Sequence, residues 1–399
     1  MSKNQIAELD ELGLIGLKIE KMEGREIVCQ GKTLVDYATT NYLGFENEPS
    51  LHELGVKYAK EWGATVGWSR LEADCHLYPK VETQIAQQLG VDKIHLSLSV
   101  TTTGFSLLYP LVGKGIVFAD REVHAVVFEG ARLARDHGAK LVSFRHQDLG
   151  HLEALLKEHA AIEPKVICID GVYSVSSEKA PIPELQALAK RYNAWLYVDD
   201  AHGFGIYGRN PFGTNTFGVG GSGIVDYFGG DYSRTFYVGS FAKAFCTVGC
   251  FVVIPKEFGG NVPSFFLSNI FSGPVTPFTL GTIQAGLDLN AADGERRRGL
   301  IRSRVVQFSK GLRGLGLKYS NEGGHPVVFV EVGEIQDLIR VATELKHAGV
   351  WAGLRPYPVV PKDQCGLRFA VSSLHTEAHV NKTLQALDEC RPYIKRKAA

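Results

Sequence analysis

Residues 165–205 read KVICIDGVYSVSSEKAPIPELQALAKRYNAWLYVDDAHGFG. Two short apolar runs bounded by turn residues, KVICID and AWLYVD, have the composition of buried strands. The segment ELQALAKRYN between them has the apolar spacing of a helix. Apolar strands joined through a helix are typical of a parallel sheet covered by helices, so this stretch predicts an α/β domain.

Further apolar runs of the same kind extend the predicted sheet. They are KIHLSL, GIVFAD, KLVSF, TFYVGS and CFVVIP. After Pro277 a long helical stretch leads to HPVVFVEVG, DLIRVATELKHAG and CGLRFAVSS, which predict a smaller α+β domain. We therefore predict an N-terminal arm over residues 1–45, a large α/β domain over 46–285 and a C-terminal α+β domain over 286–399.

The composition restricts the partners of the chain. Lys plus Arg equal Asp plus Glu at 43 each, so no overall charge attracts nucleic acid or an anionic membrane. The seven cysteines are scattered without a CxxC pair, which indicates reduced thiols and no metal site. The N-terminus has acidic residues where a signal peptide would carry basic ones, and no apolar run reaches the ~18 residues of a membrane span, so we expect a cytoplasmic protein.

Polar residues follow the predicted strands at their carboxyl ends, where ligands bind in open α/β sheets. Asp199 ends the run AWLYVD, and His202 comes shortly after it. His124 follows GIVFAD, and TFYVGS ends at Ser240, three residues before Lys243. The neighbours of this lysine, in GSFAKAF, are small or apolar, unlike those of a surface lysine. Taken singly, each of these residues also has a structural explanation, such as a helix cap or an ion pair.

Together these residue types suit a site for pyridoxal phosphate (PLP). A Schiff base needs an amine that is partly deprotonated, and a lysine in apolar surroundings meets that need. An aspartate facing the pyridine nitrogen keeps it protonated, so that the ring accepts electrons. The phosphate needs amide N–H groups and hydroxyls at a helix start, which SVTTTG at residues 99–104 can provide.

A glycine-rich stretch, GVGGSG at residues 218–223, matches the pattern of a dinucleotide-binding loop. That interpretation requires a helix directly after the pattern and an acidic residue about twenty positions further on. IVDYFGGDYSRTF follows instead, which we do not expect to be helical. We therefore interpret the stretch as a flexible loop.

Several longer motifs occur in a fixed order along nearly the whole chain. They are TTNYLGF, ADREVHA, EGARLA, IDGVYSVSSEKAPIPEL, VDDAHGFGIYG, GSFAKAF and PVVPKDQCGLRFAVSSLHT. This series resembles the α-oxoamine synthase family of fold-type I PLP enzymes. The resemblance implies a large domain with a mainly parallel sheet, a smaller α+β domain, PLP as cofactor, and a homodimer with sites at its interface.

The resemblance also implies a role for individual residues. Lys243 would form the Schiff base, Asp199 would pair with the pyridine nitrogen, His202 would reach the phenolic oxygen, and His124 would stack on the ring. The phosphate would be held by Ser240 and by the backbone at Val100 and Thr101.

Three further residues are implied in binding the substrate or the cofactor. Arg368 in GLRFAVSS would receive the amino-acid carboxylate, because a guanidinium fork suits a planar carboxylate. Asn41 in NYLG would help to position that carboxylate. Ser174 would touch the cofactor or the substrate, or alternatively would satisfy local backbone groups.

The chain departs from the family pattern at some positions. Asp170 stands where the family has a glutamate, and Trp68 replaces a small residue. Gly273 lacks the hydroxyl that reaches the phosphate of the neighbouring subunit in the family, so Ser272 or Thr276 would have to substitute.

The resemblance implies a PLP-dependent acyltransferase. It would condense an α-amino acid with an acyl thioester, giving an α-amino ketone, CO2 and a free thiol. One alternative is an aminotransferase or a β-hydroxy amino acid aldolase, and another is a catalytically silent partner subunit. Silent subunits usually lack the lysine, which is present here as Lys243. The sequence identifies neither the amino acid nor the acyl group nor its carrier.

Overall fold

The structure is a computed structural model that describes residues 3–259, 266–321 and 324–395. Contacts between residues divide the chain into two compact units. The smaller unit contains Met1–Gly44, Ser174–Glu178 and Arg296–Ala399, and the larger contains Phe45–Tyr173 and Lys179–Glu295. The three-part domain division made from the sequence stays a prediction. Within the described ranges, no helix is both long enough and apolar enough to cross a membrane.

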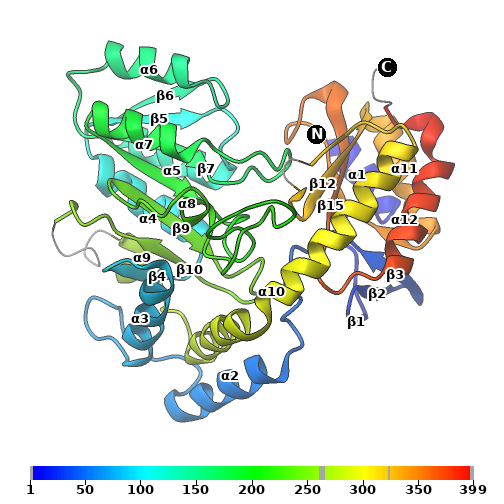
Figure 1. Cartoon of the computed structure of the whole chain (residues 1–399), viewed down its shortest axis with the longest axis horizontal. Helices are drawn as coiled ribbons and strands as arrows, with labels where there is room; N and C mark the ends of the chain where they lie inside the picture. Colours follow the sequence, from blue (N-terminus) through cyan, green and yellow to red (C-terminus); the bar gives the residue numbers. More distant parts are fainter. Residues whose placement is uncertain (1–2, 260–265, 322–323, 396–399) are drawn as a thin grey trace. The chain divides into compact units, whose positions relative to one another are not determined.

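In the described part of the larger unit, the sheet has seven strands in the order β4-β10-β9-β8-β7-β5-β6 (Figure 1). The strands from β6 to β9 in this order pair in parallel, and β10 is antiparallel to its neighbours β9 and β4. Each apolar run of the sequence forms one strand, so the predicted α/β sheet is confirmed. The strands are β4 Ile94–Ser97, β5 Ile116–Asp120, β6 Lys140–Phe144, β7 Lys165–Asp170, β8 Ala194–Asp199, β9 Thr235–Ser240 and β10 Cys250–Val253.

The helices of the larger unit precede, connect or follow these strands. They are α2 Pro49–Trp62, α3 Leu77–Leu89, α4 Val100–Val112, α5 Ala125–Asp136, α6 Leu149–Glu158, α7 Ile182–Arg191, α8 Ile224–Tyr227 and α9 Leu267–Phe271. The long helix α10, Pro277–Gly314, crosses the boundary between the two units.

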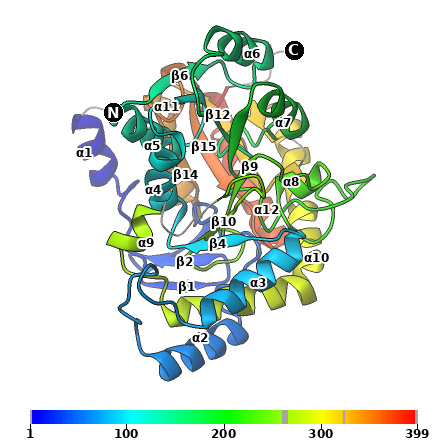
Figure 2. The ribbon, with the colours of Figure 1, turned by 90° about the vertical axis from the view of Figure 1, so that its left-hand side faces the viewer.

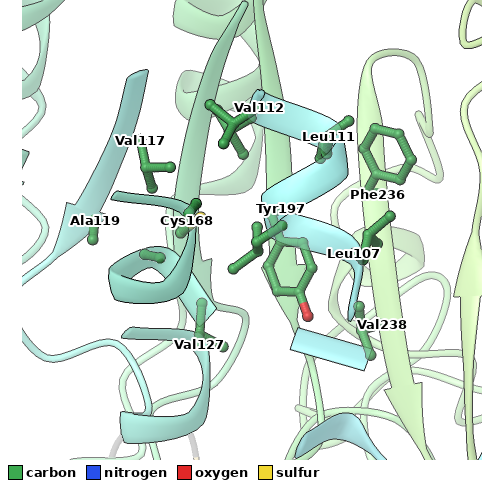
Figure 3. Packing of buried hydrophobic residues seen from close by; sticks show 14 of the residues in the cluster. Leu107, Leu111, Val112, Val117, Ala119, Val127, Cys168, Tyr197, Phe236 and Val238 are labelled. Atoms are coloured by element: carbon green, nitrogen blue, oxygen red, sulfur yellow. The ribbon is translucent and has the colours of Figure 1, made fainter. Parts of the chain in front are cut away.

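Helices α4 and α5 lie side by side and form the core on one face of the large sheet (Figures 2 and 3). Leu107 of α4 belongs to the same buried cluster as Val166 and Cys168 of β7. These strand residues are two apart because side chains alternate between the faces of a strand. The helices approach closely through glycine, since a Cβ atom on Gly130 would lie 2.5 Å from the carbonyl oxygen of Gly104.

The smaller unit contains two small sheets and confirms the predicted C-terminal α+β part. One sheet is antiparallel, in the order β11-β12-β15-β14. In the other, β1–β3 of the N-terminal segment join the late strand β13. Its elements are α1 Lys3–Glu11, β1 Lys21–Glu23, β2 Glu26–Cys29, β3 Lys32–Asp36, β11 Tyr319–Ser320, β12 Val327–Gly333, α11 Ile335–His347, β13 Val350–Trp351, β14 Gly353–Arg355, β15 Cys365–Ala370 and α12 Glu377–Glu389, with 3₁₀ turns at Lys362–Gln364 and Arg391–Tyr393.

Candidate active site

A cavity of about 200 Å³ lies at the carboxyl ends of the parallel strands of the larger unit. The predicted site residues of this unit all line it: Lys243, Asp199, His202, His124, Ser240, Val100 and Thr101. The remaining lining residues are Ser99, Val126, Asp170, Val172, Ala201, Ala242, Val248 and Gly249.

Lys243 lies on a tight turn between β9 and β10. The turn is closed by hydrogen bonds from the Phe241 N–H to the Gly249 carbonyl, at 2.9 Å, and from the Thr247 N–H to the Phe241 carbonyl, at 3.1 Å. Ala244 and Phe245 are fully buried, whereas Ala242 is exposed, and the ring of Phe245 stacks on that of Phe204 with centroids 4.9 Å apart. The apolar sequence around Lys243 therefore anchors the turn, while the lysine lines the cavity.

Two carboxylates enter the cavity from neighbouring strands. Asp199 ends β8, is 4% exposed, and accepts a hydrogen bond from the Ala201 N–H at 3.1 Å. Asp170 ends β7, is 3% exposed, and accepts one from the His124 N–H at 2.9 Å. In the sequence alone, Asp170 stands out only as a departure from the family pattern. Its position at the end of the strand next to Asp199 is the signal that identifies it as a site residue.

The N-termini of helices α4 and α5 also line the cavity. His124 is the N-cap of α5, and its Nδ1 accepts a weak hydrogen bond from the Val126 N–H at 3.4 Å. Ser99 is the N-cap of α4, and its Oγ accepts from the Thr102 N–H at 3.1 Å. The first N–H groups of a helix lack intrahelical acceptors and carry partial positive charge, so the start of α4 suits an anion such as a phosphate group.

A buried carboxylate holds the turn that follows Asp199. Asp200 is fully buried, and its Oδ2 accepts from the Ile224 N–H and from the Tyr237 hydroxyl, both at 2.8 Å. Burial raises the pKa of Asp200 to about 7. Three chain segments approach this carboxylate closely at glycines: Gly171, Gly203 and Gly223.

These contacts explain the stretch GVGGSG and correct its interpretation. A one-turn helix, α8, follows the stretch, although we did not expect a helix there. The helix can form because the carboxylate of Asp200 accepts a hydrogen bond from the N–H of Ile224, the first residue of α8. The last glycine, Gly223, has φ +103°, and a Cβ atom there would lie 1.7 Å from the Tyr237 hydroxyl oxygen. The stretch itself is a loop of turns: Val219 and Gly220 are exposed, and its last glycine packs against Tyr237.

Replacing Gly223 by alanine is therefore expected to destabilise the protein strongly. Overpacking and a backbone conformation reserved for glycine together cost about 3 kcal/mol or more. Gly220→Ala is the matched control, because Gly220 also has positive φ but a Cβ atom added there would have no other atom within 4 Å. Its cost is about 1 kcal/mol from backbone strain alone. Urea unfolding of both variants measures the difference, and equal losses would contradict the packing explanation.

The smaller unit contains the other predicted residues. Arg368 is on β15, and its Nη1 donates to the carbonyl of Ser174 at a long 3.4 Å. Arg355 on β14 lies close to it, and Asn41 is half-buried next to Tyr42. Burial lowers the pKa of Arg368, and burial with the positive charge of Arg368 lowers that of Arg355 to about 10. Among the described residues, neither arginine forms an ion pair with a carboxylate.

Two neighbouring guanidinium groups of this kind are suited to an anionic ligand. Arg355 was not predicted from the sequence, because no local pattern singles it out. The binding roles of Arg368, Arg355, Asn41 and Ser174 remain predictions.

The residues of the cavity fit PLP. A lysine amine can bond to the aldehyde, a buried carboxylate can hold the proton of the pyridine nitrogen, and the N-terminus of α4 can bind the phosphate. All three groups line one cavity of about 200 Å³.

Comparison with known proteins gives the class of the chain. The family model for aminotransferase class I and II matches residues 35–387. The chain belongs to this family and, as predicted, to the α-oxoamine synthase family of PLP enzymes within it.

Individual relatives agree with this assignment. The chain is 32% identical over 387 residues to the 8-amino-7-oxononanoate synthase of Chromobacterium violaceum, covering 96% of each chain. It is also similar to a serine palmitoyltransferase (SPT) that was solved with PLP as an internal aldimine. The identity is 25% and the TM-score 0.85, covering 97% of this chain and 96% of that one. A serine palmitoyltransferase from S. paucimobilis has a TM-score of 0.86 at 24% identity, covering 97% and 96%, and supports the fold.

Proposed function

We propose that the protein is a PLP-dependent acyltransferase that condenses an α-amino acid with an acyl thioester. The products are an α-amino ketone, CO2 and a free thiol. The observation that carries this proposal is the single cavity lined by Lys243, Asp199, His202 and His124 at the carboxyl edge of the sheet. The names of the relatives, 8-amino-7-oxononanoate synthase and serine palmitoyltransferase, support an acyl transfer of this kind.

The residues of the cavity perform distinct tasks in this proposal. PLP, when bound, supplies an electron sink for the carbanion formed at the α-carbon. Lys243 would hold the aldehyde through Nζ, and its amine, when free, would take the α-proton as a base. Asp199 would pair with the pyridine nitrogen, and His202 would bind the phenolic oxygen. His124 would pack on the ring, and the N–H groups at the start of α4 would hold the phosphate.

The substrate carboxylate needs a cationic partner until it leaves as CO2. We assign this task to Arg368, with Asn41 positioning the carboxylate. The neighbouring Arg355 adds positive charge to the same part of the smaller unit.

Thiol release tests the proposed reaction directly. The purified protein, loaded with PLP, is incubated with panels of amino acids and acyl-CoA thioesters of graded chain length. Free thiol is expected only when both substrates are present, and mass spectrometry should find the matching amino ketone. Conversion of PLP to its amine form by an amino acid alone would favour an aminotransferase instead. Absence of thiol release across broad panels would contradict the proposal.

We propose further that the protein is a homodimer. Large apolar side chains are exposed on two segments of the larger unit: Trp68 at 48%, Leu71 at 50% and Phe271 at 81%. The two segments are adjacent, because the Ser69 hydroxyl donates to the Asn269 carbonyl at 2.9 Å. Apolar side chains gathered in this way are typical of an interface between subunits.

Replacing Phe271 by glutamate is expected to weaken the dimer. A charge placed in the centre of an apolar interface has to be buried without a partner, which weakens association by about tenfold or more. Phe212→Glu is the control, because Phe212 is 73% exposed on a separate loop. Sedimentation at micromolar concentration measures both variants. A monomeric parent protein, or equal effects of the two changes, would contradict the proposed interface.

A further inference from the structure

The cavity contains a second acid that the proposed reaction does not use. Asp170 and Asp199 are the last residues of the adjacent parallel strands β7 and β8, and they are partners in the strand register. Adjacent strands are about 4.8 Å apart, and register partners direct their side chains to the same face. Both carboxyl groups line the cavity and both residues are almost completely buried.

Two buried carboxyl groups at this separation do not both ionise readily. Each would lose its hydration, and like charges repel strongly at short distance. Burial raises the pKa of Asp170 well above its usual range, and the neighbouring charge of Asp199 raises it further. The His124 N–H and the charge of Lys243 act in the opposite direction. The ionisable groups that interact electrostatically with Asp170 include Asp199, Asp120, Lys243, Tyr173 and Tyr197.

The surroundings of the two acids decide which of them keeps the proton. Asp170 is the acid whose pKa is raised well above its usual range by burial and by the neighbouring carboxylate, so the remaining proton belongs to Asp170 with or without the cofactor. One oxygen of Asp170 is fixed by the His124 N–H at 2.9 Å. For the other oxygen, the described residues give no hydrogen-bond partner, and the side chain lines the cavity.

We infer that Asp170 works as a neutral carboxylic acid that donates a hydrogen bond to an oxygen of the bound cofactor or substrate. The role as a donor rests on the proposed function, whereas the protonated state of the free protein does not. A neutral donor at this position does not add a second negative charge beside Asp199, and it offers a proton to an oxygen that becomes negative during the reaction.

Three replacements distinguish a neutral donor from an anion. Asp170→Asn keeps the size, the acceptor for His124 and a neutral donor, and is expected to retain activity within about fivefold. Asp170→Ala removes the donor and is expected to lose about 10²-fold in kcat, as for other donors to a developing oxyanion. If the asparagine variant is as inactive as the alanine variant, an anion is required and the inference is wrong. It is equally wrong if neither change affects kcat.

The pH dependence of kcat provides a second activity readout. Asp170 is a donor only below its raised pKa, so the rate of the parent protein should fall as the pH rises through that value. The asparagine variant has no proton to lose at this position and should lack that alkaline decrease. An unchanged alkaline decrease in the asparagine variant would contradict the assignment.

Thermal unfolding of the PLP-free protein tests the protonated state without any activity. Because the pKa of Asp170 is higher in the folded than in the unfolded state, the acid destabilises the fold as pH rises above its unfolded value near 4. Asp170→Asn should therefore raise Tm by about 3 °C or more at pH 8 and have little effect near pH 4. A lower Tm for the variant at pH 8 would overturn the inference, even if the proposed reaction were correct.

Asp226→Asn is the matched control for the thermal measurement. Asp226 is also a buried carboxylate of the larger unit, but it pairs with Arg209 at 2.8 Å and accepts from the Tyr232 hydroxyl. Its replacement removes an ion pair and weakens the bond from the Tyr232 hydroxyl, so it should lower Tm at pH 8. Opposite shifts for the two variants are the expected result, whereas a decrease for both would show that Asp170 is ionised in the fold.

Discussion

Replacing Lys243 by alanine is expected to abolish the condensation, with a loss of kcat of more than about 10³-fold. The amine both bonds to the aldehyde and moves the α-proton, and removing a group with two such tasks costs at least the 10²–10⁴-fold typical of a single acid or base. The rigid turn around the lysine, anchored by Phe241 and Phe245, should keep its fold in the variant, because these side chains remain buried. Thiol release and the visible absorbance of bound PLP measure the effect.

Lys256→Ala is the control for this change. Lys256 is 78% exposed and pairs with Asp92 at 2.7 Å on the surface, where an ion pair contributes little. Activity and PLP absorbance should therefore match the parent protein. Residual activity of Lys243→Ala within tenfold of the parent would show that another group performs the proton transfer.

The second large effect is expected for Asp199→Ala, with a loss of about 10²–10³-fold in kcat. A carboxylate that holds the proton on the pyridine nitrogen acts as a fixed electrostatic partner, and removing one such partner from a buried site has this magnitude. The change also removes the acceptor of the Ala201 N–H at the start of the turn that carries His202. Weaker binding of PLP, measured by equilibrium dialysis, should accompany the loss of rate.

Asp200→Ala distinguishes a direct role of Asp199 from support of the turn. Asp200 is the adjacent buried carboxylate, but it does not line the cavity. Its replacement is expected to lower stability, because the Tyr237 hydroxyl and the Ile224 N–H lose their acceptor. The loss of kcat per folded molecule should be much smaller than for Asp199→Ala. Equal kinetic losses would indicate that both acids act only by holding the turn.

The sequence was sufficient to predict the large sheet because each strand is an apolar run bounded by turn residues. The spacing between these runs, as in residues 165–205, also predicted parallel pairing correctly. It could not predict that β3 pairs with β13, since these strands are more than three hundred residues apart and only the folded chain brings them together. The one-turn helix α8 was missed because a distant carboxylate, that of Asp200, stabilises its start.

The candidate site was predictable where a residue follows a strand at its carboxyl end. Lys243, Asp199, His202 and His124 were found in this way, and they line one cavity. Asp170 fulfils the same criterion, but a single acid at a strand end has no special signal until its neighbour on the next strand is known. Arg355 was missed for a similar reason, since its proximity to Arg368 depends on the pairing of β14 with β15.

The central claim is that Lys243 bonds covalently to PLP in the cavity of the larger unit. Reduction of the PLP-loaded protein with borohydride, followed by peptide mass spectrometry, tests this claim most directly. One stable pyridoxyl adduct is expected, on the peptide that contains Lys243. An adduct on a different lysine, or a protein that releases its PLP unchanged after reduction, would contradict it.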